Sequence, residues 1–210
     1  MEYSFHVYNK LASDGVAMSM QKLLFCQQQM KMTGVGMRLR SNPPDINDIL
    51  LPPPVVVCIG SDLAIGDSLG PITGSMLKFK TQGLEVFIYG TLASPITAKE
   101  ISALRSFLKE SHPNSPVIAI DAAVGTEGDV GLMKLSNRPL LPGTGANKQL
   151  GAIGDFSIMG IVAEKSVANY SLLNSTRLNL VYTMSEIISD GLASLLWECC
   201  TNARKKRKRA

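Results

Sequence analysis

The sequence predicts an α/β fold, a three-layer sandwich in which a central, mostly parallel β-sheet lies between helices. Three short apolar runs carry this prediction, at 55–59, 84–89 and 116–120, because strands buried on both faces are nearly continuous in apolar residues. Two segments with apolar residues at helical spacing, 68–77 and 98–110, separate these runs. Strands that alternate with helices in this order favour a parallel sheet with right-handed crossovers.

The segments on either side extend this pattern. Residues 3–8 alternate weakly and predict an edge strand, and Asp14 predicts the start of a helix that continues to about Met32. Glycine and proline breaks over 33–47 predict a loop.

Beyond the third apolar run we expect a strand on the margin of the sheet over 130–135 and another strand over 156–163. The segment 139–154 is long and rich in glycine, which is typical of a binding loop rather than a plain connection. Residues 170–200 predict a long helix that breaks near Gly191.

Composition places the chain among globular proteins. Its 210 residues suffice for one domain with a real core, and 45% are hydrophobic while 18% are charged. No apolar run approaches the ~20 residues of a membrane span, and the N-terminus lacks the plan of a signal peptide, so we expect a cytoplasmic protein without a membrane partner. We expect three parts: a helix-containing extension packed on the core (1–51), an α/β domain (52–202) and a disordered basic tail (203–210).

The formal net charge of +4 is concentrated at the C-terminal end. Six positive charges lie between Arg204 and Arg209, and without them the rest of the chain carries −2. Blocks of like charge are usually disordered. The tail therefore predicts a weak, salt-sensitive contact with nucleic acid, or a solubilising end with no partner.

The cysteines and histidines form no pattern typical of a metal site. None of the four cysteines has CxxC spacing, so we expect them to be reduced and Cys58 to lie in the core. The two histidines, His6 and His112, lie in no ligand cluster. We therefore expect no metal and no other cofactor.

Two aspartates are the candidate catalytic residues. Asp67 follows the glycine-bearing loop after the first apolar run, and Asp121 directly follows the third. Carboxyl ends of parallel strands share one edge of the sheet, where chemistry collects. Two carboxylates close together share a proton, so one can activate water while the other protonates a leaving group. The alternative is structural, with Asp67 as a helix cap and Asp121 as a strand-end residue.

Two loops offer further interpretations. A phosphate site over 61–70 is disfavoured on chemical grounds, because the loop has no GK[ST] or GxGxxG pattern and contains Asp62 and Asp67. In the segment 142–148, glycines would let the backbone approach a peptide, and Lys148 could stabilise an oxyanion or a carboxylate. A turn with a solvated lysine explains that segment equally well.

Three motifs carry a family resemblance. CIGSDLAIGDSLGP, VIAIDAAVG and LPGTGANKQLGAIGDFSIMGIV together resemble the sporulation proteins of the YyaC type, which are similar to the spore germination protease. The match spans roughly Pro54 to Cys200. It implies the phosphorylase/hydrolase-like α/β sandwich of the germination and hydrogenase maturation proteases. The germination protease degrades the small acid-soluble proteins that coat spore DNA.

The resemblance also implies roles for particular residues. Asp67 falls on a catalytic aspartate of the germination protease, and on a metal-binding glutamate of the maturation proteases, while Asp121 falls on the second acid of both. No histidine matches the further metal ligand of the maturation proteases. The residues expected to bind substrate are Asp62, Gly143, Gly145, Asn147 and Lys148.

The function expected from these observations is a sporulation-linked endopeptidase in the cytoplasm of the forespore or sporulating cell. Its substrate would be a peptide or a small acid-soluble spore protein, with the Asp67–Asp121 pair as general acid and base. One alternative is a catalytically silent relative that binds a spore protein or peptide. A second is a metal-dependent hydrolase that uses the same acids.

Overall fold

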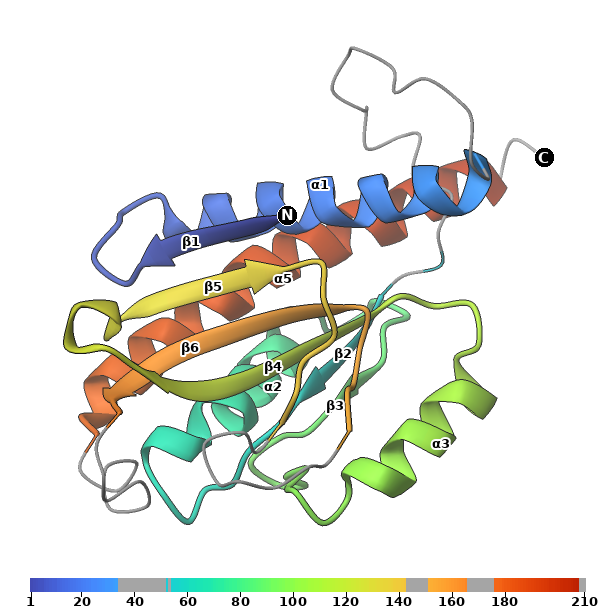
Figure 1. Ribbon diagram of the computed structural model, residues 1–210. Helices are drawn as coiled ribbons and strands as arrows, with labels where there is room; N and C mark the ends of the chain where they lie inside the picture. The colour runs from blue at the N-terminus through green and yellow to red at the C-terminus, as the bar shows by residue number, and fades with distance from the viewer. Residues whose placement is uncertain (34–51, 53, 143–150, 166–175, 208–210) are drawn as a thin grey trace.

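The structure, a computed structural model, describes residues 1–33, 52, 54–142, 151–165 and 176–207 (Figure 1). In this part of the chain six strands form one sheet in the order β1-β5-β6-β4-β2-β3. Their bounds are β1 (Glu2–His6), β2 (Val55–Cys58), β3 (Ile88–Tyr89), β4 (Val117–Gly125), β5 (Leu132–Ser136) and β6 (Phe156–Glu164). Strands β6, β4, β2 and β3 are parallel to one another, whereas β5 runs antiparallel to both of its neighbours, β6 and β1. The predicted α/β class with a mostly parallel sheet is confirmed.

Helices cover both faces of the sheet. Helices α1 (Ala12–Thr33), α2 (Leu69–Lys80) and α5 (Leu178–Arg207) lie on one face, and α3 (Ile101–Ser111) lies on the other (Figure 1). Because side chains alternate along a strand, β2 supplies both cores. Val56 and Cys58 face the larger core, while Val55 and Val57 face α3.

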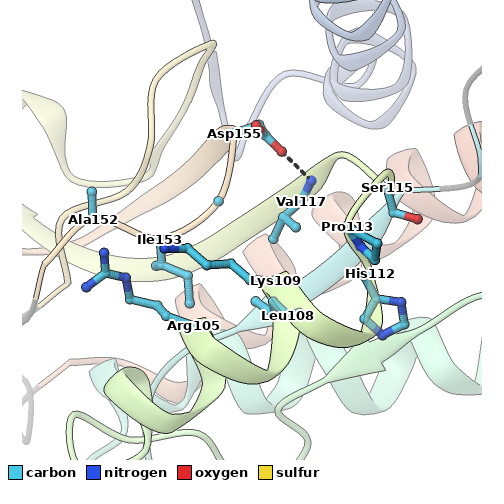
Figure 2. A pocket seen from close by; sticks show the side chains of 11 residues that line it. Arg105, Leu108, Lys109, His112, Pro113, Ser115, Val117, Ala152, Ile153 and Asp155 are labelled. Carbon is cyan, nitrogen blue, oxygen red and sulfur yellow. Dashed lines mark hydrogen bonds between the residues drawn. The ribbon is translucent and has the colours of Figure 1, made fainter.

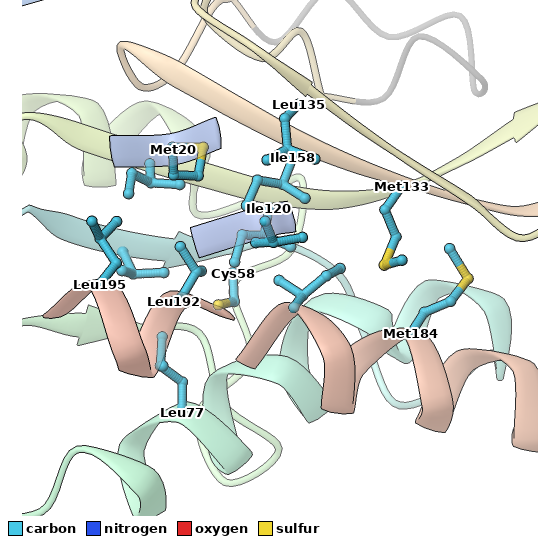
Figure 3. Packing of buried hydrophobic residues seen from close by; sticks show 14 of the residues in the cluster. Met20, Cys58, Leu77, Ile120, Met133, Leu135, Ile158, Met184, Leu192 and Leu195 are labelled. Carbon is cyan, nitrogen blue, oxygen red and sulfur yellow. The ribbon is translucent and has the colours of Figure 1, made fainter. Parts of the chain in front are cut away.

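The larger core holds most of the buried apolar side chains. Figure 3 shows Cys58, Ile120 and Ile158 of the sheet packed with Leu192 and Leu195 of α5. All of these side chains are essentially inaccessible to solvent. Cys58 is thus a core residue as predicted, and none of the four cysteines forms a disulfide in the described structure.

The N-terminal segment belongs to this core. β1 pairs with β5 along its whole length, which confirms the predicted edge strand and makes β1, not β5, the margin of the sheet. α1 packs on α5 at Gly191, where an added Cβ would lie 2.6 Å from the Ser13 carbonyl oxygen. The predicted break at Gly191 is wrong, because this glycine serves close helix packing and α5 continues through it.

Three other expectations need correction. The strand expected over 84–89 is limited to Ile88–Tyr89, because only two residues of β2 pair with it. Phe107 is one of the apolar residues at helical spacing in 98–110 and was for that reason expected to face inward, but it is 43% exposed. The tail expected to be disordered from 203 continues α5 as far as Arg207, which fits the high helix propensity of Lys and Arg and their favourable position at a helix C-terminus.

Among the described helices, none combines the length and apolar character needed to cross a membrane.

Candidate functional site

The loop that leads from β2 into α2 positions Asp67. The chain turns at Gly60, whose φ of 138° favours glycine and whose missing side chain leaves room for the Asp67 carbonyl group. The backbone N–H of Ser61 donates to the Asp67 carbonyl oxygen at 3.2 Å. Ser68 closes the other side of the loop, since its hydroxyl donates to the Ile65 carbonyl at 2.6 Å. Asp67 therefore lies in a short 3-10 turn, η2 (Gly66–Ser68), that is held at both ends.

Glycines bring α2 unusually close to the sheet at this edge. A Cβ on Gly70 would collide with the Ile59 carbonyl, and one on Gly74 would collide with the Gly90 carbonyl. Gly90 in turn lies against the Cys58 carbonyl, with a φ of 85°. Backbone meets backbone at these contacts, so α2 begins directly over the carboxyl ends of β2 and β3.

Asp121 lies in the middle of β4, and not at its end as the sequence predicted. β4 continues to Gly125 because β6 pairs with it over nearly that whole length. β2, by contrast, stops at Cys58, which pairs with Ile120. Asp121 is therefore the first residue of β4 that β2 no longer covers. This places it beside the loop that holds Asp67.

The two carboxyl groups influence each other electrostatically. Burial raises the pKa of Asp67, and a hydrogen bond from the Ser61 N–H partly offsets this. Burial raises the pKa of Asp121 well above its ordinary range, and the nearby Asp67 charge raises it further. The Ala122 N–H, 2.8 Å from Asp121 Oδ1, offsets only part of this effect. Close, partly desolvated carboxylates of this kind favour a state with one shared proton.

A capping role does not account for Asp67. In the described structure, neither η2 nor α2 has a side-chain hydrogen bond at its N-cap, and the N-cap of α2 is Ser68. The Ser61 N–H of the preceding loop bonds the Asp67 backbone carbonyl, and its proximity lowers the pKa of the Asp67 carboxyl group.

The expected substrate-binding residues lie partly outside the described structure. Asp62 lies in the turn between β2 and η2, where it is exposed. Gly143, Gly145, Asn147 and Lys148 lie outside the described residues. Of the predicted site, the structure thus brings together Asp67 and Asp121, with Asp62 nearby in the same loop.

The donor set for a metal ion is incomplete in the described residues. No group of three His, Cys, Asp or Glu side chains converges there. His6 of β1 contacts the Val130 carbonyl, and His112 follows α3 and contacts the Tyr89 hydroxyl. Neither histidine supplies a third ligand beside the acid pair.

Sequence reasoning missed one feature. A cavity of about 340 Å³ lies between α3 and the segment 152–155, at the amino ends of β4 and β6. It contains neither Asp67 nor Asp121. Its basic side chains, Arg105 and Lys109, are four residues apart on α3, and that spacing was visible in the sequence. The opposite wall was not, because only the fold brings 152–155 against α3.

Fold and site together define an α/β protein with a coupled pair of aspartates at the carboxyl edge of a parallel sheet. Residues 45–191 match the family described as "Protein of unknown function (DUF1256)", and the chain belongs to this family. The chain is 41% identical over 141 residues to "Uncharacterized protein YyaC" of Bacillus subtilis (strain 168), a stretch that covers 67% of this chain and 68% of that protein. The resemblance to YyaC-type proteins is thereby confirmed.

A solved structure is also similar. It is the NiFe hydrogenase maturation protease HycI from Thermococcus kodakarensis KOD1, with a TM-score of 0.44 and 16% sequence identity. The similarity covers 68% of this chain and 91% of that one.

Proposed function

We propose that this protein is an endopeptidase that uses Asp67 and Asp121 as a proton-sharing pair. The observation that carries the proposal is the position of Asp121 where β2 ends and β4 continues, next to the loop that holds Asp67, so that the charge of Asp67 raises the pKa of Asp121. Perturbed pairs of titratable groups at a sheet edge are a frequent mark of a catalytic site.

The different surroundings of the two acids assign them different roles. The nearby Ser61 N–H lowers the pKa of Asp67, which favours its ionised form. Asp121 is more strongly disfavoured as an anion, by burial and by Asp67. The pair titrates as a unit and carries its shared proton mainly on Asp121. Asp67 then acts as the general base toward water, and Asp121 protonates the leaving amine.

The substrate proposed is a small acid-soluble spore protein or a peptide from one, in the cytoplasm of the forespore or sporulating cell. This part rests on the sequence resemblance to the YyaC type and, through it, to the germination protease. Asp62, Gly143, Gly145, Asn147 and Lys148 are proposed to contact the substrate. The basic residues that follow Ala203 are proposed to add a weak, salt-sensitive attraction to nucleic acid.

The test is a peptidase assay on small acid-soluble spore proteins, with cleavage followed by mass spectrometry. Wild type should cleave, and Asp67→Asn or Asp121→Asn should each lower the rate by about 10²–10⁴-fold. The double variant should lose little more, because the two residues act as a unit. Asp14→Asn removes an exposed acid in the first turn of α1 and is the matched control.

The outcomes separate the alternatives. Cleavage that survives thorough chelation removes the metal-dependent hydrolase, whereas loss on chelation supports it. Binding of the spore protein without cleavage, measured by calorimetry, identifies a catalytically silent relative. Equal cleavage by wild type and Asp67→Asn would contradict the proposed pair.

A further inference from the structure

The cavity between α3 and the segment 152–155 has an apolar floor. Leu108, Val117 and Ile153 line it, and each is a buried residue of the smaller core. Its volume of about 340 Å³ lies at the lower end of the range for small-molecule sites, about 300–1,000 Å³. A small organic group would therefore fit against this floor.

Two cationic side chains border the same cavity. Arg105 and Lys109 are one helical turn apart and so lie on the same side of α3. Figure 2 shows both side chains extending from α3 toward the segment 152–155 on the opposite wall. The Arg105 guanidinium packs against Gly151, where an added Cβ would lie 2.5 Å from Nη1.

Neither cation has an acidic partner in the described structure. The two ion pairs found there are Lys80–Asp190 and Lys134–Asp129. The acid that lines the cavity, Asp155, is already occupied: Oδ2 accepts from the Val117 N–H at 2.8 Å, and Oδ1 from Gln27 Nε2 at 3.2 Å (Figure 2). The cavity thus presents two cations, neither of them in an ion pair with a described residue, beside one carboxylate whose two oxygens accept hydrogen bonds from neutral donors.

A purely structural role accounts for Lys109 but not for Arg105. Lys109 lies in the last turn of α3, where a cation offsets the negative end of the helix dipole. Arg105 lies one turn earlier, where this effect has faded. Its guanidinium is nevertheless held at the cavity rim against a glycine backbone.

We propose that this cavity binds an amphipathic organic anion. Its phosphate or carboxylate group would lie between Arg105 and Lys109, and its apolar part would lie on Leu108, Val117 and Ile153. Arginine suits this task because its planar fork can bind both oxygens of such a group. The site lies at the amino end of β4 and contains neither Asp67 nor Asp121, so binding should be independent of the acid pair.

Isothermal titration calorimetry of the full chain with phenyl phosphate tests the proposal. Inorganic phosphate and benzyl alcohol supply the charge alone and the ring alone, and each should bind at least about tenfold more weakly. Benzoate as a second probe distinguishes a preference for carboxylate from one for phosphate. The double variant Arg105→Gln/Lys109→Gln should lower affinity for the preferred probe by about tenfold or more, as expected for lost hydrogen bonds to charged groups.

Two controls make the result specific. Lys78→Gln removes an exposed cation of α2, and Asp67→Asn removes an acid of the candidate active site; both should bind like wild type. If the double variant does not fold, Lys109→Glu at an exposed position gives the same comparison. No binding of either aromatic anion by wild type would overturn the proposal. Equal affinity in wild type and the cavity variants, or an equal loss in Lys78→Gln, would also overturn it.

Discussion

Asp155 lies at the amino end of β6 and Asp121 lies in the middle of β4, where β2 ends, and their surroundings differ sharply. Asp155, just before β6, receives hydrogen bonds from the Val117 N–H and from Gln27. Asp121, in β4, receives one from the Ala122 N–H and lies close to the charge of Asp67. The Asp155 carboxylate accepts a hydrogen bond on each of its oxygens and links the start of β6 to Val117 of β4. The Asp121 carboxylate, by contrast, is destabilised as an anion by burial and by the charge of Asp67.

Of the changes considered, alanine substitution at two glycines with positive φ should give the largest difference in stability. Gly90→Ala places a methyl group against the Cys58 carbonyl at a φ of 85° and should destabilise the fold by about 3 kcal/mol or more. Gly83→Ala has nearly the same φ, 84°, but nothing lies within 4 Å of the new Cβ. It should cost only about 1 kcal/mol. Urea denaturation of both variants measures the difference, and equal losses would mean that the close approach of α2 does not constrain this edge.

Asp121→Asn should stabilise the protein at neutral pH. The folded-state pKa of Asp121 is raised above the ordinary value of 3.8, so the native state binds more protons than the unfolded state between these two values. Wild-type stability therefore falls as pH rises through this window, by about 1.4 kcal/mol for each pKa unit between the two states. The variant lacks this loss. Urea midpoints from pH 3 to 8 should converge near pH 3 and separate toward pH 8; parallel curves would contradict the strained pair.

The same substitution at the other end should act in the opposite direction. Asp155→Asn keeps the shape but replaces charge-assisted hydrogen bonds from Val117 and Gln27 with neutral ones. Neutral hydrogen bonds contribute less, so we expect a loss of about 1 kcal/mol at neutral pH. Glu110→Gln, at an exposed position of α3, is the control. A gain in stability for Asp155→Asn would remove the contrast between the two ends.

Local patterns in the sequence were enough to predict the central strands and the acid pair. Buried strands form within the runs at 55–59, 116–120 and 156–163, because nearly continuous apolar residues favour a strand that is covered on both faces of the sheet. The length of β4 could not be predicted in this way. Residues 121–125 become strand through pairing with β6, a contact between segments distant in the sequence.

Two errors have the same origin. Gly191 looks like a helix breaker in isolation, yet it lies under Ser13 of α1, and that contact is tertiary. Likewise, Phe107 fits the apolar stripe of α3 but contacts Tyr89 and His112 at the surface rather than the core. Where an apolar or glycine residue meets a partner far along the chain, sequence spacing alone does not specify its role.

The pairing of β1 with β5 has a consequence for how the chain folds while it is being synthesised. β1 and α1 leave the ribosome before their partners, because the strand that pairs with β1 begins only at Leu132 and the helix that packs on α1 begins only at Leu178. Contacts of such long sequence separation form late and slow folding. β1 therefore lacks its neighbouring strand until β5 has been made, and α1 lacks its neighbouring helix until α5 has been made. A helix with an apolar face left exposed for that time is a natural target for a chaperone.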